Sequence, residues 1–412
     1  MKKNTNREKF RRAKAAILNQ DGHRSLAEII AGDRDAFSGL RLLFASDVSG
    51  APIQVALEET GCASSLFCGK GMLVFSDEIE AQMRLGRADI QFGVRAILDT
   101  NLLSDLPKFF AGNELSTRAS VEAALQFVLA NLGGHIDWTF ASLENLREVS
   151  KANNPWPFLK VAAAHHFDKR GLSPIGKEGL LEYMPAADDQ WRSWLASDDC
   201  WRQITRRDLC YAVTLFAVRE CWKGSTVNEA MSNLVDFCLE SFNTLPLKEL
   251  YFGWKAITGI HEPSGRLAVF AERALCFPTK DSLKRISALA WDLFIFRWCE
   301  TLMTELKGAK FYIPAVTTLD NALLATIKAC PLRALLVDDT GEAVEAIFDD
   351  ELDFQRCLDS SISDASRIKI DDPERQAKAD RISRYELAQA IFSLEEEIAE
   401  MVKVAKTSGG GA

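Results

Sequence analysis

Two aspartates in this chain follow apolar segments that have the pattern of buried β-strands. Asp99 stands in I-L-D-T-N (97–101), after the apolar run that begins at Val94, and Asp320 stands in T-T-L-D-N (317–321). In open α/β sheets the ligand crevice lies at the carboxyl ends of the strands, so both carboxylates are candidates to bind a ligand there. An aspartate in this position also serves as the N-cap of the helix that follows, which is the structural alternative for each.

Two further acids and three polar neighbours complete the candidate set. Glu144 lies in F-A-S-L-E-N-L-R-E and Asp292 in A-L-A-W-D-L-F-I-F, both in segments with helical periodicity. Three polar residues flank the strand-end aspartates: Thr100, Asn101 and Thr318. We expect Thr100 to hydrogen-bond locally and to hold the Asp99 carboxylate in place. If the four acids converge in the fold, their carboxylates stay ionised only if cations neutralise them.

The order of these acids resembles that of the PIN-domain family of metal-dependent nucleases. That family has a strand ending in Asp-Thr/Ser-Asn, a Glu in a later helix, an Asp on a further helix and a final Thr-x-Asp corner. Four acids match these motifs in order: Asp99, Glu144, Asp292 and Asp320. The match covers residues 95–150 and 285–340, and a long, mostly helical stretch separates its two parts.

The resemblance implies an α/β fold with a PIN-like central parallel sheet, enlarged by a large helical insertion and an N-terminal extension. It also implies that the four acids hold Mg²⁺ or Mn²⁺, which favour oxygen ligands. Such an ion activates water for attack on a phosphodiester. The predicted function is a metal-dependent nuclease or endoribonuclease, a hydrolase with RNA or single-stranded nucleic acid favoured as substrate. A toxin-like or defence role and RNA processing both fit this function.

Two other functions stay open. A haloacid-dehalogenase-like phosphatase has an Asp at the end of its first strand, as Asp99 would be, and a later strand followed by paired acids, as in L-L-V-D-D (335–339). That family has a second Asp two residues after the first, however, and this chain has Asn101 there. A turn after a strand is the more usual role of a pair such as Asp338 and Asp339. The second alternative is a non-catalytic scaffold in which a degenerate nuclease core binds a partner.

Periodicity and turn signals divide the chain into parts. We expect the following segments: an N-terminal mixed α/β extension (1–90), the first half of the PIN-like core (91–150), a helical insertion (151–284), the second half of the core (285–345), and a charged connection with a C-terminal helix (346–412). The last helix carries a short heptad stripe from Leu387 to Met401. We expect this stripe to dock on the body of the protein, or to contact a protein partner or a second copy of the chain.

Composition limits the classes of partner. The chain has 412 residues, with 49 Lys and Arg against 58 Asp and Glu and a formal net charge of −9. This balance argues against a generally basic nucleic-acid coat but permits local basic clusters, as at residues 2–14, Lys169-Arg170 and Arg206-Arg207. No apolar run is long enough for a signal peptide or a membrane span, and the ten cysteines form no CxxC pair. We therefore expect a cytoplasmic protein with reduced thiols and no membrane contact.

Overall fold

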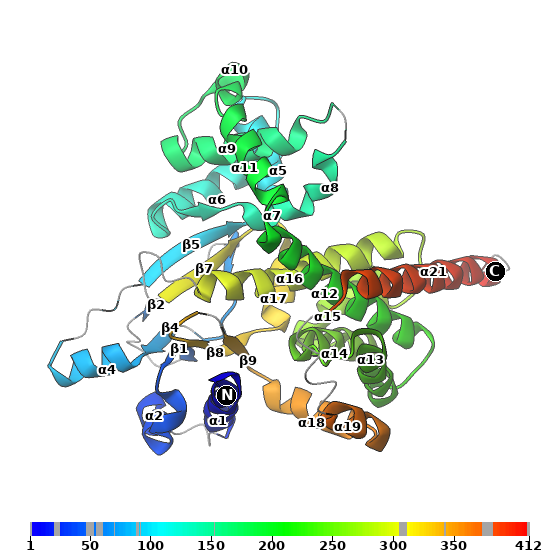
Figure 1. The fold of residues 1–412 in the computed structure, drawn as a ribbon. Coiled ribbons are helices and arrows are strands. Elements are labelled where there is room, and N and C mark those ends of the chain that lie inside the picture. The colour runs from blue at the N-terminus through cyan, green and yellow to red at the C-terminus, as the bar shows by residue number, and fades with distance from the viewer. Residues whose placement is uncertain are drawn as a thin grey trace. The chain divides into compact units, whose positions relative to one another are not determined.

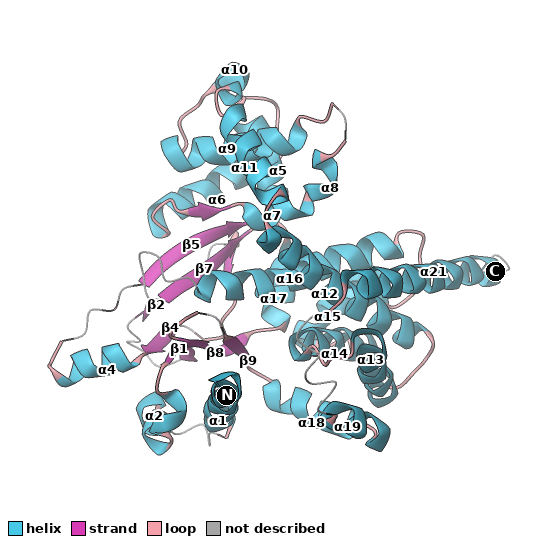
Figure 2. Cartoon of the chain, in the orientation of Figure 1, coloured by secondary structure: helices cyan, strands magenta, loops and turns pink. Residues whose placement is uncertain are grey.

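The protein is described by a computed structural model that covers residues 2–19, 25–46, 53–54, 61–69, 71–87, 90, 92–151, 153–304, 311–341, 343–372 and 382–409. It is a mixed α/β structure in which helices predominate and the sheets are small (Figure 2). The chain divides into two compact units. The first unit comprises Met1–Asp188, Trp298–Asn321 and Pro331–Glu351, and the second comprises Asp189–Arg297, Ala322–Cys330 and Leu352–Ala412.

A four-stranded sheet in the first unit contains both predicted strands. Its order is β3 (Ala63–Ser65), β7 (Phe311–Thr317), β5 (Phe92–Leu98) and β6 (Ile136–Asp137). Strand β5 is parallel to β6 and β7, and β3 is antiparallel to β7. Strands β5 and β7 pair from Phe92 opposite Phe311 to Leu98 opposite Thr317. The expected parallel strands are therefore present and adjacent.

Helices α5 (Thr100–Phe110), α6 (Arg118–Asn131) and α9 (Trp156–Arg170) cover one face of this sheet (Figure 1). Leu102 and Leu106 of α5 are fully buried in one core with Leu98 of β5. Their spacing of four residues places both side chains on the same face of the helix. The shorter helices of this part are α7 (Thr139–Glu144), α8 (Leu146–Val149) and α10 (Gly176–Leu181).

The second sheet of the first unit corrects two predictions. Its order is β2 (Ile53–Gln54), β4 (Gly71–Phe75), β1 (Leu40–Ser46), β8 (Leu332–Asp338) and β9 (Val344–Phe348), and every pair is antiparallel. Residues 1–90 are therefore not a separate extension, since β1 lies at the centre of this sheet. The core likewise has two sheets instead of one central parallel sheet. Pairing between segments so distant in the chain leaves no local pattern, so it could not be predicted.

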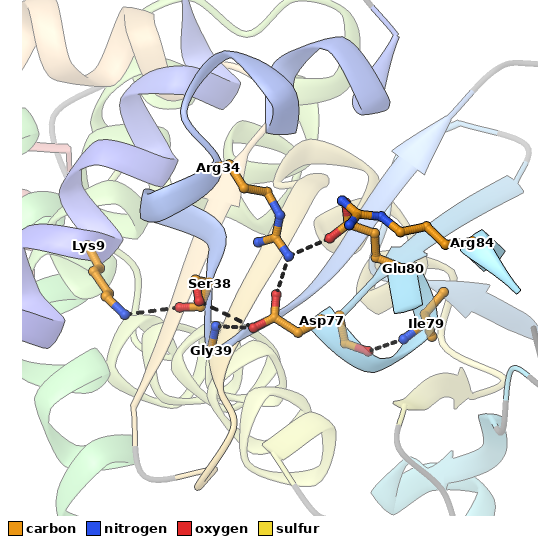
Figure 3. A network of polar contacts seen from close by, with 9 residues as sticks. Lys9, Arg34, Ser38, Gly39, Asp77, Ile79, Glu80 and Arg84 are labelled. Atoms are coloured by element: carbon orange, nitrogen blue, oxygen red, sulfur yellow. Dashed lines mark hydrogen bonds and ion pairs between the residues drawn. The ribbon is translucent and has the colours of Figure 1, made fainter. Parts of the chain in front are cut away.

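A polar network joins α3 (Arg34–Phe37) and α4 (Asp77–Arg84) just before the start of β1. The chain reaches α3 through α1 (Lys2–Leu18) and α2 (Leu26–Gly32). Arg34 forms ion pairs with Asp77 at 2.7 Å and with Glu80, and Gly39 N donates to Asp77 Oδ2 at 2.9 Å (Figure 3). Burial acts to raise the pKa of Asp77, but these partners lower it below its ordinary value. The network anchors α3 and α4 at the start of the strand.

The second unit is built from helices. These are α11 (Met184–Leu195), α12 (Asp198–Trp222), α13 (Val227–Phe242), α14 (Leu247–His261), the 3-10 helix η2 (Gly265–Leu267), α15 (Ala268–Phe270), the π-helix η3 (Ala271–Leu275), α16 (Ser282–Thr304), α17 (Asn321–Ala329), α18 (Glu351–Ser361), α19 (Asp364–Asp371) and α21 (Arg384–Gly409), some of whose end residues belong to the first unit. Helix α12 packs against α13, α14 and α21. None of the helices in the described ranges is long and apolar enough to span a membrane.

The heptad stripe of α21 packs within the chain. Leu387, Leu394 and Ile398 are buried, and α21 lies against α12. Tyr211 Oη of α12 donates to Glu395 Oε1 at 2.8 Å, which fixes α21 in register with α12. The stripe therefore docks on the body of the protein, one of its two expected roles, and gives no support for a partner or second copy bound there.

Two other predicted boundaries differ from the structure. The helical segment expected as one insertion (151–284) is split at residues 188 and 189, because α9 and α10 belong with the sheet of the first unit. The segment expected as a charged connection contains α18 and α19, and residues 373–381 of it lie outside the described residues. Charge-rich composition is also typical of the exposed face of a helix, which explains the second error.

Candidate functional site

Asp99 and Asp320 lie at the same edge of the β5–β7 sheet. Asp99 follows the last residue of β5, and its amide donates to the carbonyl oxygen of Thr317 at 3.0 Å. Asp99 is 6% exposed and Thr318 is fully buried, whereas Asp320 is half-buried. The chain leaves both parallel strands at this edge, which is where the sequence predicted the two acids to meet.

The Thr318 hydroxyl joins the two acids. Its Oγ1 donates to Asp99 Oδ2 at 2.8 Å and accepts from the amide nitrogen of Asp320 at 2.9 Å. Burial raises the pKa of Asp99 above the ordinary value of an aspartate, and the nearby negative charge of Asp320 adds to the rise. The hydrogen bonds from Thr318 and from the backbone at Thr100 and Asn101 oppose it. A cation beside this pair would relieve the cost of the buried charge.

A hydrogen bond with Thr100 holds the Glu144 side chain next to the end of β5. The hydroxyl of Thr100 donates to Glu144 Oε2, so it holds Glu144 instead of Asp99, which differs from the expectation. The side chain of Asn101 is exposed, and its contribution is a backbone amide at 3.4 Å from Asp99 Oδ2. Three of the predicted acids are therefore connected around the end of β5. We call this set the strand-end cluster: Asp99, Thr100, Glu144, Thr318 and Asp320.

Asp292 is placed differently from its prediction. It lies on α16 in the second unit, where its carboxylate forms an ion pair with Arg273 of η3. The two side chains are 15% and 13% exposed, so the arginine compensates a largely buried charge. The order of acids along the chain carried no information about this partner. We therefore leave Asp292 out of the site.

Sequence reasoning missed two buried charged residues near the cluster. Asp137 ends β6, the third parallel strand, and its Oδ1 accepts from the amide of Thr139 at 2.7 Å. Lys160 of α9 is 6% exposed, and its Nζ donates to Asn145 Oδ1 at 2.7 Å, next to Glu144 in the chain. A two-residue strand is too short to recognise, but a lysine within the apolar segment F-L-K-V-A-A-A was a usable signal.

The side chains of the strand-end cluster offer oxygen donors, which are the kind of ligand that a hard divalent ion prefers. Within the described ranges, no three His, Cys, Asp or Glu side chains are grouped so as to hold a metal ion. Mg²⁺ commonly binds one or two protein carboxylates and keeps several waters, so Asp99 and Asp320 are the relevant pair. Their oxygen donors and the buried charge of Asp99 suit Mg²⁺ or Mn²⁺ better than a softer ion.

The acids proposed for a phosphatase lie in the other sheet. Asp338 ends β8, which pairs with β1 and β9 and not with β5. Its carboxylate accepts from the amide of Ala343 at 3.0 Å and from Thr340 Oγ1 at 2.7 Å, so it stabilises the turn between β8 and β9. For Asp338 this is the turn role expected from the sequence, and its position gives the phosphatase alternative no support.

Several of the basic side chains have partners within the protein. Arg207 lies over the rings of Tyr211 and Trp291. Basic residues of α1 form these ion pairs in the first unit: Arg11 with Glu8, Arg12 with Asp33, and Lys14 with Glu345 and Glu351. The side chains of Lys2, Lys3 and Arg7 lie outside the described residues. The paired residues do not identify a nucleic-acid-binding surface.

No protein-family model, no curated protein and no solved structure matches this chain. The resemblance to PIN-domain nucleases therefore stays a prediction from the motifs. The case for a function depends on the geometry of the strand-end cluster.

Proposed function

We propose that this protein is a PIN-like, metal-dependent nuclease that hydrolyses phosphodiester bonds, with RNA or single-stranded nucleic acid as substrate. One observation carries the proposal. Asp99 and Asp320 follow adjacent parallel strands, and a single hydroxyl, that of Thr318, bridges the Asp99 carboxylate and the Asp320 amide. A buried carboxylate with a raised pKa beside a second acid is a typical arrangement of functional sites.

Each residue of the strand-end cluster would have a different role in this reaction. Asp99 and Asp320 would hold Mg²⁺ or Mn²⁺, an ion that makes water a stronger nucleophile and offsets charge on the leaving oxygen. Thr318 fixes the orientation of Asp99 by donating to Oδ2. Thr100 fixes Glu144, which would orient the attacking water. The burial of Asp99 limits access of bulk water and strengthens the electrostatic interactions there.

The test begins with metal binding. We expect millimolar Mn²⁺ to raise the melting temperature of the wild type relative to EDTA, because an ion that binds only the folded state stabilises it. Asp99→Asn should remove this rise. Asp105→Asn is the matched control, since Asp105 lies on α5 and accepts from Thr117 Oγ1 at 2.6 Å, outside the cluster. Loss of the Mn²⁺ effect in both variants, or in neither, would contradict the assignment.

Cleavage assays then distinguish a nuclease from a phosphatase. The proposal predicts Mn²⁺-dependent cleavage of single-stranded RNA or DNA by the wild type and by Asp105→Asn, and none by Asp99→Asn. A phosphatase would instead release phosphate from small phosphomonoesters.

The non-catalytic scaffold remains the second candidate. The lack of a three-residue metal group in the described part of the chain favours it. It predicts neither cleavage nor a metal-dependent shift.

A further inference from the structure

Trp156 is an exposed aromatic residue at the start of α9. All nine tryptophans lie within the described residues, and Trp156 is the most exposed of them, at 36%. Tryptophan is enriched at binding surfaces, because its ring offers a large apolar contact and a polar edge. Exposure alone identifies no ligand, so the position and surroundings of the ring must show what it could bind.

The first turn of α9 lies beside the helices that carry the strand-end cluster. Lys160, one helical turn after Trp156, donates from Nζ to Asn145 Oδ1 at 2.7 Å. Asn145 follows Glu144 at the end of α7, and Glu144 accepts from the Thr100 hydroxyl at the start of α5. Residues four apart share one face of a helix, so Trp156 lies on the same face of α9 as Lys160. It stands about 6 Å farther along the helix axis.

Helices α5 and α9 run in the same direction. The rings of Phe110 and His166, near the far ends of the two helices, have centroids 4.8 Å apart. The contacts of Thr100 and Lys160 with the end of α7 lie near the opposite ends. Both helices therefore begin at the edge of the sheet where the chain leaves β5, and Trp156 stands at that edge.

The backbone that carries the Trp156 ring is fixed on both sides. Pro155 and Pro157 flank it, and the ring of each proline restricts its own φ angle. The amide of Trp156 donates to Asn154 Oδ1 at 3.2 Å, and Asn154 Nδ2 donates to Glu148 Oε2 of α8 at 3.3 Å. A ligand that stacks on this ring orders little additional chain, which favours affinity.

The segment around Trp156 is positively charged, although the whole chain has a net charge of −9. Residues 145–160 have a net charge of +2, from three basic residues and one acid: Arg147, Lys151, Lys160 and Glu148. Arg147 is exposed, and Lys151, which is also exposed, pairs with Glu148 at 2.5 Å. Positive charge beside an exposed aromatic ring suits a nucleic acid, whose phosphates attract cations and whose unpaired bases stack on aromatic side chains.

We infer that Trp156 is a stacking platform for an unpaired base of a single-stranded nucleic acid, and that Arg147 of the adjoining α8 attracts its phosphates. This inference rests on the nuclease function proposed above. The stacked base positions the strand beside Asp99 and Asp320, where the phosphodiester is hydrolysed. The bases of a duplex are already stacked on both sides, so the platform favours single strands.

Fluorescence anisotropy with an end-labelled single-stranded oligoadenylate tests the platform. The titrations are done in EDTA, so that metal-dependent cleavage does not consume the probe. Trp156→Ala should bind about tenfold more weakly than the wild type, because it removes one base-stacking contact. Trp156→Phe keeps a ring and should stay within about threefold. Phe277→Ala is the matched control, because it removes an aromatic side chain that is 75% exposed in the second unit.

An abasic strand of the same length separates stacking from structural damage. The wild type should bind it about tenfold more weakly than the oligoadenylate, whereas Trp156→Ala should bind the two strands within about twofold of each other. Arg147→Gln should weaken both strands alike and lower the slope of log K against log salt concentration by about one. Equal losses on both strands in Trp156→Ala, or no loss on the oligoadenylate, would overturn the inference.

The outcomes also separate this inference from the nuclease proposal. Cleavage of single strands by the wild type with unchanged affinity in Trp156→Ala would overturn the platform and leave the nuclease intact. Binding that depends on Trp156 without Mn²⁺-dependent cleavage would support the platform and contradict the nuclease. No binding of any strand by the wild type would overturn the platform.

A second measurement covers the case in which Trp156→Ala does not fold. The indole N–H signals of ¹⁵N-tryptophan-labelled wild type are then followed by NMR during titration with each strand. The Trp156 signal, identified by its absence in Trp156→Phe, should shift with the oligoadenylate and not with the abasic strand. A stationary Trp156 signal at saturation would overturn the inference.

Discussion

Replacing Thr318 by valine removes the hydroxyl that joins Asp99 to Asp320 and keeps the branched shape of the side chain. Two hydrogen bonds are lost, of 2.8 Å to the Asp99 carboxylate and 2.9 Å from the Asp320 amide. A hydrogen bond to a charged group contributes about 1.5–3 kcal/mol and a neutral one about 0.5–1.5 kcal/mol. Thr318 is fully buried, so water cannot simply replace it. We expect Thr318→Val to lower the free energy of unfolding of the first unit by about 2–4 kcal/mol at neutral pH.

The free energy of unfolding lost in Thr318→Val depends on pH, and the pKa of Asp99 sets the direction of this dependence. Burial keeps its pKa in the folded protein above the value in the unfolded chain, so the folded state binds this proton more tightly. Its contribution to stability therefore falls as the pH rises from the unfolded to the folded pKa. Valine raises the folded pKa further, because the donor to the ionised form is gone. Below about pH 4 the cost of Thr318→Val should fall to the part that does not depend on pH, which includes the lost bond from the Asp320 amide, and it should be largest above the folded pKa of Asp99.

Urea unfolding of the wild type, Thr318→Val and Thr318→Ser at acidic and neutral pH tests this reasoning. Serine keeps the hydroxyl and removes one buried methyl group, which costs about 1 kcal/mol at either pH. The transition that shifts in Asp99→Asn identifies the unfolding of the first unit. Equal losses for valine and serine at neutral pH, or a valine–serine difference that does not shrink in acid, would refute the argument.

Three predictions concern helix packing and the second unit. In Gly253→Ala the new Cβ would lie 2.7 Å from a neighbouring side-chain carbon, so thermal melts should show a loss of about 1–3 kcal/mol. Gly32→Ala meets no atom within 4 Å and should cause no loss. Burial acts to raise the pKa of Glu220, but its hydrogen bonds and neighbouring cations lower it below its ordinary value. The ionised Glu220 therefore stabilises the folded protein, and this contribution is lost as the pH falls through the folded pKa. Glu220→Gln should therefore flatten the acid limb of stability against pH. Tyr211→Phe removes the bond to Glu395 and should cost about 1 kcal/mol and speed amide exchange in α21.

The strand-end aspartates could be predicted because their signals are local. Strands β5 and β7 are apolar runs that end at Leu98 and Thr317, and an acid follows each run before a helix begins. The parallel register of the two strands then brings Asp99 and Thr318 side by side without further information. The docking of α21 was predictable for the same reason, since its heptad stripe is continuous in the sequence.

The parts that could not be predicted depend on partners elsewhere in the chain. Strand β1 reads as a short apolar segment, and nothing in it identifies β8 as its neighbour. Asp292 fits the order of acids, but its ion pair with Arg273 depends on how η3 packs. Lys160 could have been noticed as a charge in an apolar segment, but only the structure connects it to Asn145.

Capping of α5 alone does not explain why residue 99 is an aspartate. Asp99 caps α5, but its bond to the Asn101 amide is long at 3.4 Å, and its 2.8 Å bond is with Thr318. Serine and asparagine cap about as well as aspartate and carry no charge. Burial makes the charged residue the costly choice, as its raised pKa indicates. Asp99→Asn should therefore keep the cap and melt at a higher temperature than the wild type in EDTA. A lower melting temperature would mean that the carboxylate is needed for the fold, and the argument that its charge serves a cation would fail.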